Sequence, residues 1–468
     1  MNPTRRSFLS GLAALPLARA QASLPPPNII FILADDLGWG DPACYGNPYI
    51  KTPNLDRLAR EGSLFTQFYV NSPVCSPSRT AFMTGQYPAH HRIHGHLAAP
   101  ELNARRDMPD FLDPNVVMLP RLLQKAGYAT AAIGKWHLGS GPGAPPPREY
   151  GFDFVRTHVS NDTSWAARVK SDPYFWARCT PLIVDETLRF IEHNRQRPFY
   201  ANVWTTLPHA PLHPADEDMA PYRRFGPQQA APYRGAREIY YASVTHLDRE
   251  LGRLFDKLDK WGLAGNTLLV FSSDNGPEDI FIANAGHSGV GSPGPFRGRK
   301  RSLYEGGVRV PFLVRWPKRV PARRVDNDSV ITAVDFLPTM ARLAGAEPPS
   351  GWRLDGEDRS GALLGTSSKR TKPILWEWRF NVAAHPWNRS PILSIRDGDW
   401  KLLMNPDRSR VELYDIPRDP VEQNNLADRN PAVVRRLSET VLAWQKKLPA
   451  GMMDPGAGRN DYPWPGTK

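Results

Sequence analysis

Residues 28–36 read NIIFILADD, an apolar run that ends in two aspartates, Asp35 and Asp36. A short and nearly continuous apolar run of this kind is typical of a strand that is buried on both faces of a parallel sheet. Three later runs share the pattern, and each is followed by polar residues: residues 128–134, 199–206 and 267–273. Helical patterns separate the runs, for example over residues 116–125 and 237–261.

This alternation predicts an α/β fold with a large, mixed but mostly parallel sheet that is sandwiched by helices. In such sheets ligands bind beyond the carboxyl ends of the strands. The side chains expected there are Asp35 and Asp36, Lys135 and His137, His209, and Asp274 and Asn275. Because four separate strands deliver them to one edge, we expect these residues to form a single site.

The sequence becomes small and polar around residues 362–372, which indicates a domain boundary. Beyond it, residues 374–378, 391–395, 400–404 and 411–414 have the composition of short antiparallel strands, and residues 430–447 that of a closing helix. We therefore expect a catalytic domain over 27–365, a smaller α+β subdomain with an antiparallel sheet over 373–448, and an extended tail over 449–468.

Residues 1–20 have the features of an export signal: Arg5 and Arg6, a short apolar stretch, and the small-residue cleavage pattern Ala18-Arg19-Ala20. The arginine pair followed by Phe8-Leu9 resembles a twin-arginine signal, so the expected partner is the twin-arginine export machinery and the expected location is the periplasm or the medium. The apolar stretch is too short for a membrane anchor. A basic disordered tail is the alternative.

The formal net charge of the 468 residues is +12, and residues 1–20 contribute three arginines and no acidic residue, which leaves +9. A basic protein attracts polyanionic substrates over long range. Nucleic acid is not the expected partner, because the basic residues are scattered and no nucleic-acid-binding motif is present. The three cysteines cannot form a disulfide framework, although Cys44 and Cys179 could pair if Cys75 has another role.

Residues 75–85 read CSPSRTAFMTG. Ser76 and Pro77 have the pattern of an N-cap and first helical residue, which places Cys75 at a helix N-terminus, where anions are favoured. The motif resembles the signature of formylglycine-dependent sulfatases in the alkaline phosphatase superfamily. The resemblance implies that a maturation enzyme oxidises Cys75 to formylglycine (3-oxoalanine) and that its hydrate attacks sulfate esters. An ordinary buried cysteine before a helix is the alternative.

Asp35, Asp36, Asp274 and Asn275 offer only oxygen ligands, which suit Ca²⁺ or Mg²⁺ and not zinc. Each motif alone would usually be a turn or a helix cap. The family resemblance implies one divalent cation at these positions, with residue 75 as a further ligand; Ca²⁺ is favoured over Mg²⁺, and the sequence does not decide between them.

The resemblance extends to residues 134–139, GKWHLG, and to the segment around Lys300. It implies that Arg79 supports the formylglycine, that Lys135 and Lys300 bind the sulfate, and that His209 donates toward the leaving-group oxygen. One hydroxyl of the hydrate would attack sulfur, and deprotonation of the other by His137 would release sulfate and restore the aldehyde. Histidines with purely structural roles and a solvent-facing Arg79 are the alternatives.

The substrate mouth is harder to predict. His94 and His96 follow the nucleophile helix, and Trp378, Arg379 and His385 begin the small domain, so we expect them to contact substrate; core packing is the alternative. The combined features predict a sulfuric ester hydrolase that acts on a sulfated polysaccharide or oligosaccharide. The competing hypotheses are a phosphomonoester or phosphodiester hydrolase of the same superfamily and a non-catalytic binder of sulfated glycans.

Overall fold

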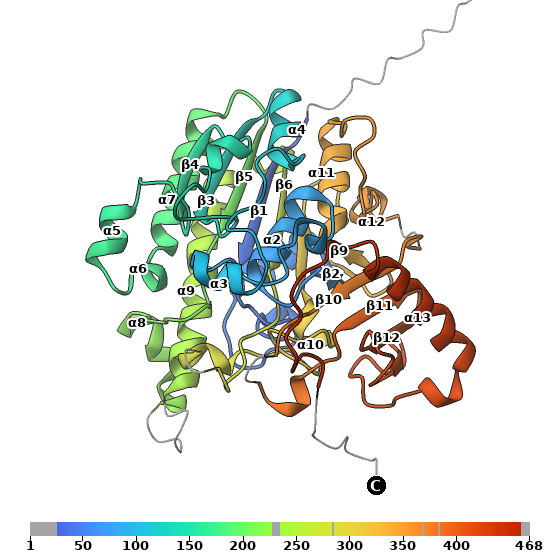
Figure 1. Ribbon diagram of the computed structural model, residues 1–468. Coiled ribbons are helices and arrows are strands. Elements are labelled where there is room, and N and C mark those ends of the chain that lie inside the picture. Colours follow the sequence, from blue (N-terminus) through green and yellow to red (C-terminus); the bar gives the residue numbers. More distant parts are fainter. Residues whose placement is uncertain (1–25, 227–234, 283–284, 367–368, 382–383, 460–468) are drawn as a thin grey trace, which may run out of the picture.

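Residues 28–34 form β1 (Asn28–Ala34), a central strand of a nine-stranded sheet in the computed structural model (Figure 1). The structure describes residues 26–226, 235–282, 285–366, 369–381 and 384–459. The predicted export signal over residues 1–20 and the last part of the predicted tail lie outside the described residues. None of the described helices is both long and apolar enough to cross a bilayer.

The main sheet has the strand order β4-β3-β5-β1-β6-β7-β2-β8, with β9 beside β2. The five strands from β4 to β6 are parallel, whereas β7 is antiparallel to both β6 and β2. The prediction of a mixed, mostly parallel sheet is therefore confirmed. Its other strands are β2 (Ser63–Tyr69), β3 (Ala129–Lys135), β4 (Phe154–His158), β5 (Phe199–Trp204), β6 (Thr267–Ser273), β7 (Arg309–Arg315), β8 (Arg324–Asp326) and β9 (Ile331–Thr332).

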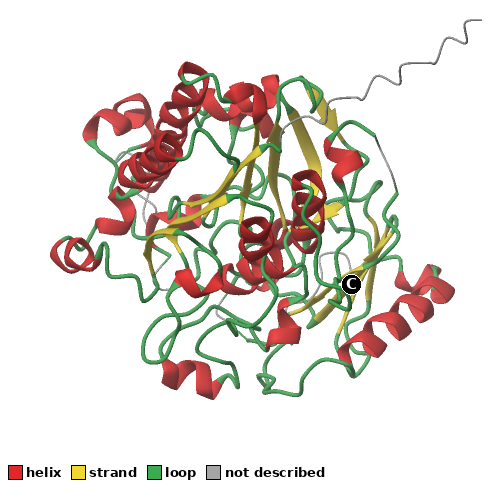
Figure 2. Cartoon of the chain, turned by 90° about the horizontal axis from the view of Figure 1, so that it is seen from above, coloured by secondary structure: helices red, strands yellow, loops and turns green. Residues whose placement is uncertain are grey.

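Both faces of β1 are buried because its side chains alternate between two apolar cores. The odd-numbered residues from Ile29 to Leu33 pack into one core, and the even-numbered residues from Ile30 to Ala34 pack into the other. The first core is covered by α2 (Cys75–Thr84), α4 (Leu119–Lys125) and α11 (Phe336–Ala344), the second by α1 (Pro53–Glu61), α7 (Thr180–His193) and α9 (Ala236–Lys260). Figure 2 shows helices on both sides of the sheet.

Shorter helices lie in the loops: α3 (Pro100–Arg105), α5 (Ala166–Ser171), α6 (Phe175–Arg178), α8 (Asp216–Met219), α10 (Glu305–Val308) and α12 (Ser360–Leu363). Short 3₁₀ helices are η1 (Ala43–Tyr45), η2 (Pro88–His91), η3 (Pro147–Tyr150), η4 (Ala220–Phe225), η5 (Ala264–Asn266), η6 (Gly286–Val290), η7 (Ala333–Asp335), η8 (Pro386–Asn388) and η9 (Ala427–Arg429).

A second, four-stranded antiparallel sheet lies at one side of the main sheet and is covered by α13 (Pro431–Gln445) (Figures 1 and 2). Its strands are β10 (Ile374–Glu377), β11 (Leu393–Asp397), β12 (Trp400–Met404) and β13 (Glu412–Asp415). This arrangement confirms the expected smaller sheet with a closing helix. The domain boundaries at 365 and 373 remain a prediction.

The two sheets share one apolar core, and polar contacts reinforce the junction. The indole N–H of Trp376 in β10 donates to the backbone oxygen of Val70 at 2.7 Å. Lys401 of β12 lies 2.9 Å from both Glu305 and Glu422 and is completely buried. A buried ammonium is tolerated where carboxylates surround it, so this cluster fixes the second sheet against the segment that follows Lys300.

Candidate active site

The carboxyl ends of the parallel strands border a cavity of about 1050 Å³. Its lining includes five residues singled out from the sequence motifs: Cys75, Lys135, His137, His209 and Lys300. Asp35, Asp36, Asp274, Asn275 and Arg79 lie at its closed end and are at most 1% exposed. The expected convergence of the strand ends is thus present in the structure.

Cys75 is the first residue of α2, and it is only 3% exposed. Burial raises the pKa of its thiol, and Lys135 and Lys300 oppose this effect. The N-cap is Val74 in an extended conformation, so the expectation that Ser76 caps the helix is wrong. The Ser76 hydroxyl has another partner, because it accepts the backbone N–H of Leu97 at 3.0 Å.

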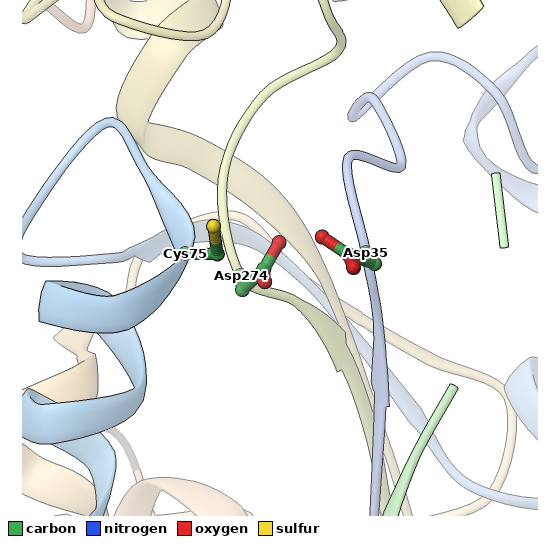
Figure 3. A group of neighbouring side chains, drawn as sticks. All are labelled: Asp35, Cys75 and Asp274. Carbon is green, nitrogen blue, oxygen red and sulfur yellow. The ribbon is translucent and has the colours of Figure 1, made fainter. Parts of the chain in front are cut away.

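Two carboxylates lie beside Cys75. The parallel register of β1 and β6 pairs Ala34 with Ser273, so Asp35 and Asp274 leave the sheet side by side. The Cys75 sulfur and a carboxylate oxygen of each aspartate lie within 4.8 Å of one another, and Figure 3 shows the three side chains converging from separate elements.

The donor set at this point fits a hard divalent cation. Among the described residues, Asp35 Oδ1 and Asn275 Oδ1 are buried oxygens without a hydrogen-bond partner. The Asn275 amide nitrogen donates to Asp36 Oδ1 at 2.7 Å, so this side chain lies directly beside the Asp36 carboxylate. Burial, followed by the charge of Asp35, raises the pKa of Asp274 to about 7. A cation among these oxygens would remove that repulsion.

Arg79 lies one turn after Cys75 and is completely buried. Its Nε and Nη2 donate to Asp274 Oδ2 at 3.1 and 2.7 Å, and its Nη1 donates to the backbone oxygen of Lys135 at 2.7 Å. The guanidinium also stacks on Trp204 at 5.0 Å. Arg79 is therefore part of the closed end of the cavity and not a solvent-facing side chain.

Two buried lysines each form an ion pair with one of the consecutive aspartates Asp35 and Asp36. Lys135 Nζ lies 2.5 Å from Asp35 Oδ2, and Lys300 Nζ lies 2.7 Å from the Asp36 carboxylate. Burial works against the charged forms, but the aspartates raise both lysine pKa values. Gly134 permits the delivery of Lys135, because it has a φ of +99° and any Cβ there would lie 1.9 Å from the Trp204 oxygen.

The two candidate histidines have defined hydrogen bonds on one ring nitrogen. His137 Nε2 donates to the Leu97 oxygen at 3.0 Å, which leaves Nδ1 buried and, among the described residues, without a partner. Burial, then Lys135, lowers the His137 pKa, so the free nitrogen is a neutral acceptor. His209 donates from Nδ1 to the Ala210 oxygen at 2.6 Å, and its Nε2 lies 3.8 Å from Asp36 Oδ2.

Of the five residues expected to contact substrate, only His96 lines this cavity. His94 Nδ1 lies 3.5 Å from Glu377 Oε2, and Arg379 Nε donates to the same oxygen at 2.6 Å. These groups are buried where the second sheet packs against the main domain. Trp378 is also buried, and it packs edge-on against Phe380.

The expected substrate role of His94, Trp378 and Arg379 is therefore corrected to a structural role at the junction of the two sheets. His385 borders a separate surface hollow, where its ring centroid lies 5.4 Å from that of Phe281. The possible pairing of Cys44 with Cys179 is absent, since both are free thiols.

Several cavity residues carried no signal that could identify them from the sequence alone. They come from segments without a motif, two of them in the short helices α6 and η6: Tyr174, Trp176, His213 and His287. Glu278 and Arg301 also line the cavity. Their positions could have been suspected, because Glu278 follows Asn275 closely and Arg301 follows Lys300 directly.

Comparison with known proteins places this geometry in a family. The sulfatase family model matches residues 27–346, and a model described as N-sulphoglucosamine sulphohydrolase, C-terminal, matches residues 296–447. Human arylsulfatase A is 32% identical over 93% of this chain and 90% of its own length. The N-acetylgalactosamine-6-O-sulfatase of Bacteroides thetaiotaomicron is 29% identical over 88% of this chain and 92% of its own length.

A solved structure agrees with the sequence comparisons. The crystal structure of Ps i-CgsB in complex with k-i-k-neocarrahexaose matches with a TM-score of 0.74 and 29% identity, covering 90% of this chain and 92% of that chain.

Proposed function

This chain belongs to the sulfatase family, whose members hydrolyse sulfate esters, and we propose that its substrate is a sulfated polysaccharide or oligosaccharide and that Cys75 is matured to formylglycine. The observation that carries the proposal is the position of Cys75 at a helix N-terminus, within 4.8 Å of two carboxylates and at the closed end of a large cavity. A structural cysteine has no need of this combination.

Three basic side chains near Cys75 can balance the negative charge of a sulfate ester. A sulfate monoester is negatively charged, so a nucleophile can approach it only where that charge is balanced. Lys135 and Lys300 project into the cavity beside Cys75, and Arg79 holds Asp274 behind it. These groups are fixed before substrate arrives, which is the condition under which they stabilise developing charge best.

A divalent cation and a formylglycine would supply chemistry that the side chains of this chain lack. Asp35, Asp36, Asp274 and Asn275 would hold one divalent cation, with residue 75 beside them, and we favour Ca²⁺ over Mg²⁺. When bound, the cation supplies positive charge at the nucleophile, and a hydrated aldehyde at residue 75 supplies two hydroxyls on one carbon.

Two histidines are placed to move protons. His137 keeps a buried and unpaired Nδ1, so we assign it as the base that accepts a proton at the nucleophilic carbon. His209 lines the cavity and retains some exposure, so we assign it to the leaving-group oxygen. Their different environments support the division of roles.

A saccharide substrate is supported by the size of the cavity and by the relatives. A volume of about 1050 Å³ exceeds what a single small aryl sulfate fills. One relative is named for a sulfated amino sugar, and one structural neighbour holds a neocarrahexaose. The basic net charge suits a polyanion.

We further propose that a formylglycine-generating enzyme modifies Cys75 before export, and that residues 1–20 direct the folded protein through the twin-arginine machinery to the periplasm or the medium. The catalytic domain would comprise 27–365 and the α+β subdomain 373–448. A folded export route is compatible with a site that includes residues from Asp35 to Lys300, since these meet only in the folded protein.

The test begins with mass spectrometry of the tryptic peptide over residues 61–79 from protein made in the native host. We expect the mass of the aldehyde in place of the thiol, and no turnover of any sulfate ester by Cys75→Ala. The same enzyme should cleave a sugar sulfate far faster than the corresponding phosphate ester. An unmodified thiol, or full turnover by Cys75→Ala, would overturn the proposed mechanism; faster phosphate cleavage would favour the phosphate-hydrolase alternative.

A further inference from the structure

One wall of the cavity carries basic side chains that take no part in the site described above. His96 and Arg301 line the cavity, and Arg106 contacts His96 next to the lining, with its Nη1 3.5 Å from the backbone oxygen of His96. We refer to His96, Arg106 and Arg301 as the basic wall. Arg106 immediately follows α3, and Arg301 immediately follows Lys300.

Two members of the basic wall, His96 and Arg106, have no acidic partner among the described residues. Within the described parts of the chain, no carboxylate pairs with Arg106, and the guanidinium instead stacks on Phe380 at 5.2 Å. The imidazole of His96 likewise makes no hydrogen bond to a described residue. Arg301 has one partner, Glu278, and Glu278 also lies 3.4 Å from Lys300.

The pKa values of His96 and Arg106 are consistent with the lack of an acidic partner for either side chain. Burial lowers the pKa of His96 to about 3, and Arg106, Lys300 and Arg301 lower it further in that order. Burial also lowers the pKa of Arg106, followed by the repulsion from Arg301. At this pKa the His96 imidazole is neutral, so the two charges of the basic wall are those of Arg106 and Arg301. An anion that binds beside Arg106 would offset its repulsion from Arg301 and would accept hydrogen bonds from its guanidinium.

We propose that the basic wall binds a second anionic group of the substrate, a sulfate or carboxylate on the same sugar unit as the scissile sulfate or on its neighbour. The inference rests on the proposed sulfatase activity and adds that the natural substrate carries at least two negative charges near each other. Lys300 and Arg301 are consecutive and both line the cavity, so one segment serves the two anions. Arginine suits this task because its guanidinium can donate hydrogen bonds to two oxygens of one anion at once.

The chain offers a matched control for the test. Arg105 and Arg106 are adjacent, but Arg105 is exposed and makes no contact with His96, whereas Arg106 does. Arg105→Ala therefore removes the same charge from the same region without touching the basic wall. The substrates are a singly sulfated hexosamine, its disulfated counterpart, and a disaccharide in which the singly sulfated hexosamine adjoins a uronate.

We expect wild type to prefer a doubly charged substrate, and Arg106→Ala to lower kcat/KM for it by at least about tenfold, mainly through KM, because a hydrogen bond between charged groups is lost. For the singly charged substrate the loss should stay within about threefold. Arg105→Ala should behave as wild type on all three. The second anionic group is a sulfate if kcat/KM depends on Arg106 for the disulfated hexosamine, and a carboxylate if it does so for the disaccharide with the uronate.

Equal losses by Arg106→Ala on singly and doubly charged substrates would overturn the inference and leave the sulfatase proposal intact. Equal effects of Arg105→Ala and Arg106→Ala would also overturn it, because they would show a general effect of net charge. Failure of matured wild-type enzyme to cleave any of these sulfates would overturn the proposed saccharide activity and the inference with it.

Discussion

The closed end of the cavity and its basic wall are built differently from the same kinds of residue. At the closed end every cation has a carboxylate partner: Lys135 with Asp35, Lys300 with Asp36, and Arg79 with Asp274. These groups are almost completely buried. At the basic wall Arg106 is partly exposed and, among the described residues, has no carboxylate partner.

This difference in charge pairing indicates which part of the cavity carries out the reaction and which part selects the substrate. Buried charges cost desolvation energy, which partners must offset, and the resulting pairs are rigid before substrate arrives. The closed end should therefore act on the sulfate group of any substrate and determine kcat. A partly exposed charged group without a partner, such as Arg106, forms a charge pair only with a ligand of the right shape. The basic wall should therefore affect KM and the choice of substrate.

The largest effect should follow removal of the cation. Exhaustive chelation should lower kcat by at least about a thousandfold, because Asp35 and Asp274 would then repel each other and the substrate without compensation. Adding Ca²⁺ back should restore wild type but not Asp35→Asn, whose substitution also leaves Lys135 buried without its partner. The measurement is kcat on one sulfate ester as a function of added metal. Activity that survives chelation with no bound metal in elemental analysis would contradict the assigned role of the closed end.

The next effect concerns Lys135 and Lys300, to which we assign binding of the sulfate group. Lys300→Ala should reduce kcat/KM by about a hundredfold, and by the same factor on singly and doubly charged substrates, because it removes charge from the common sulfate group. Lys318→Ala is the control, since Lys318 is an exposed lysine after β7, which is antiparallel to the strands that lead into the site. A loss confined to doubly charged substrates would instead assign Lys300 to the basic wall. The closed end and the basic wall would then not have the separate roles proposed for them.

Much of the closed end could be predicted because it follows from local pattern. The strands β1 and β6 are apolar runs that end at Asp35 and Asp274, and parallel topology alone brings such ends together. The strand β2 was not predicted, because Thr66 and Gln67 interrupt its apolar pattern where its pairing with β7 shifts register. The strand β7 was missed because it contains Pro311, a residue depleted in strands.

The errors in the site have a common physical origin in tertiary contacts. Ser76 has an ideal N-cap side chain, yet Leu97 from a distant loop takes its hydroxyl and Val74 becomes the cap. His94 and Arg379 are polar residues near functional segments, but Glu377 and the packing of the second sheet bury them. Local sequence specifies which side chains follow a strand, and it does not specify which loop will cover them.

A smaller effect should come from the support of His137. The Ser76 hydroxyl holds the Leu97 N–H, and the Leu97 oxygen holds His137 Nε2, both at 3.0 Å. Ser76→Ala should loosen this link and lower kcat by about fivefold, as expected for loss of one buried hydrogen bond. Burial lowers the His137 pKa, so greater access of water should move that pKa back toward its ordinary value.

The acid limb of the kcat profile should therefore shift to higher pH in Ser76→Ala, because the protonated imidazole cannot accept a proton. Rates should be normalised to formylglycine content, since residue 76 lies beside Cys75, the proposed site of modification. Ser78→Ala is the matched control: Ser78 is in the same helix, but its hydroxyl donates to the Ser72 oxygen at 2.8 Å and does not contact Leu97. The same shift in both variants would show a general disturbance of α2.

The smallest effect should occur at the outer edge of the cavity. Tyr174 lines the cavity with 41% of its surface exposed, and its ring centroid lies 4.3 Å from that of His213. A ring in this position can stack on a further sugar unit, so Tyr174→Ala should raise KM for an oligosaccharide by about threefold while Tyr174→Phe keeps the wild-type value. Tyr49→Ala controls for loss of an exposed tyrosine, because Tyr49 packs on Phe225 outside this cavity.

The distinguishing measurement is the ratio of KM values for an oligosaccharide and for its terminal sulfated sugar. Tyr174→Ala should change that ratio, because the terminal sugar already fills the closed end and does not reach the outer ring. An unchanged ratio with both KM values raised would place Tyr174 against the first sugar. Selectivity would then begin directly beside the paired charges, and the separation between a rigid reactive end and an adaptable outer edge would disappear.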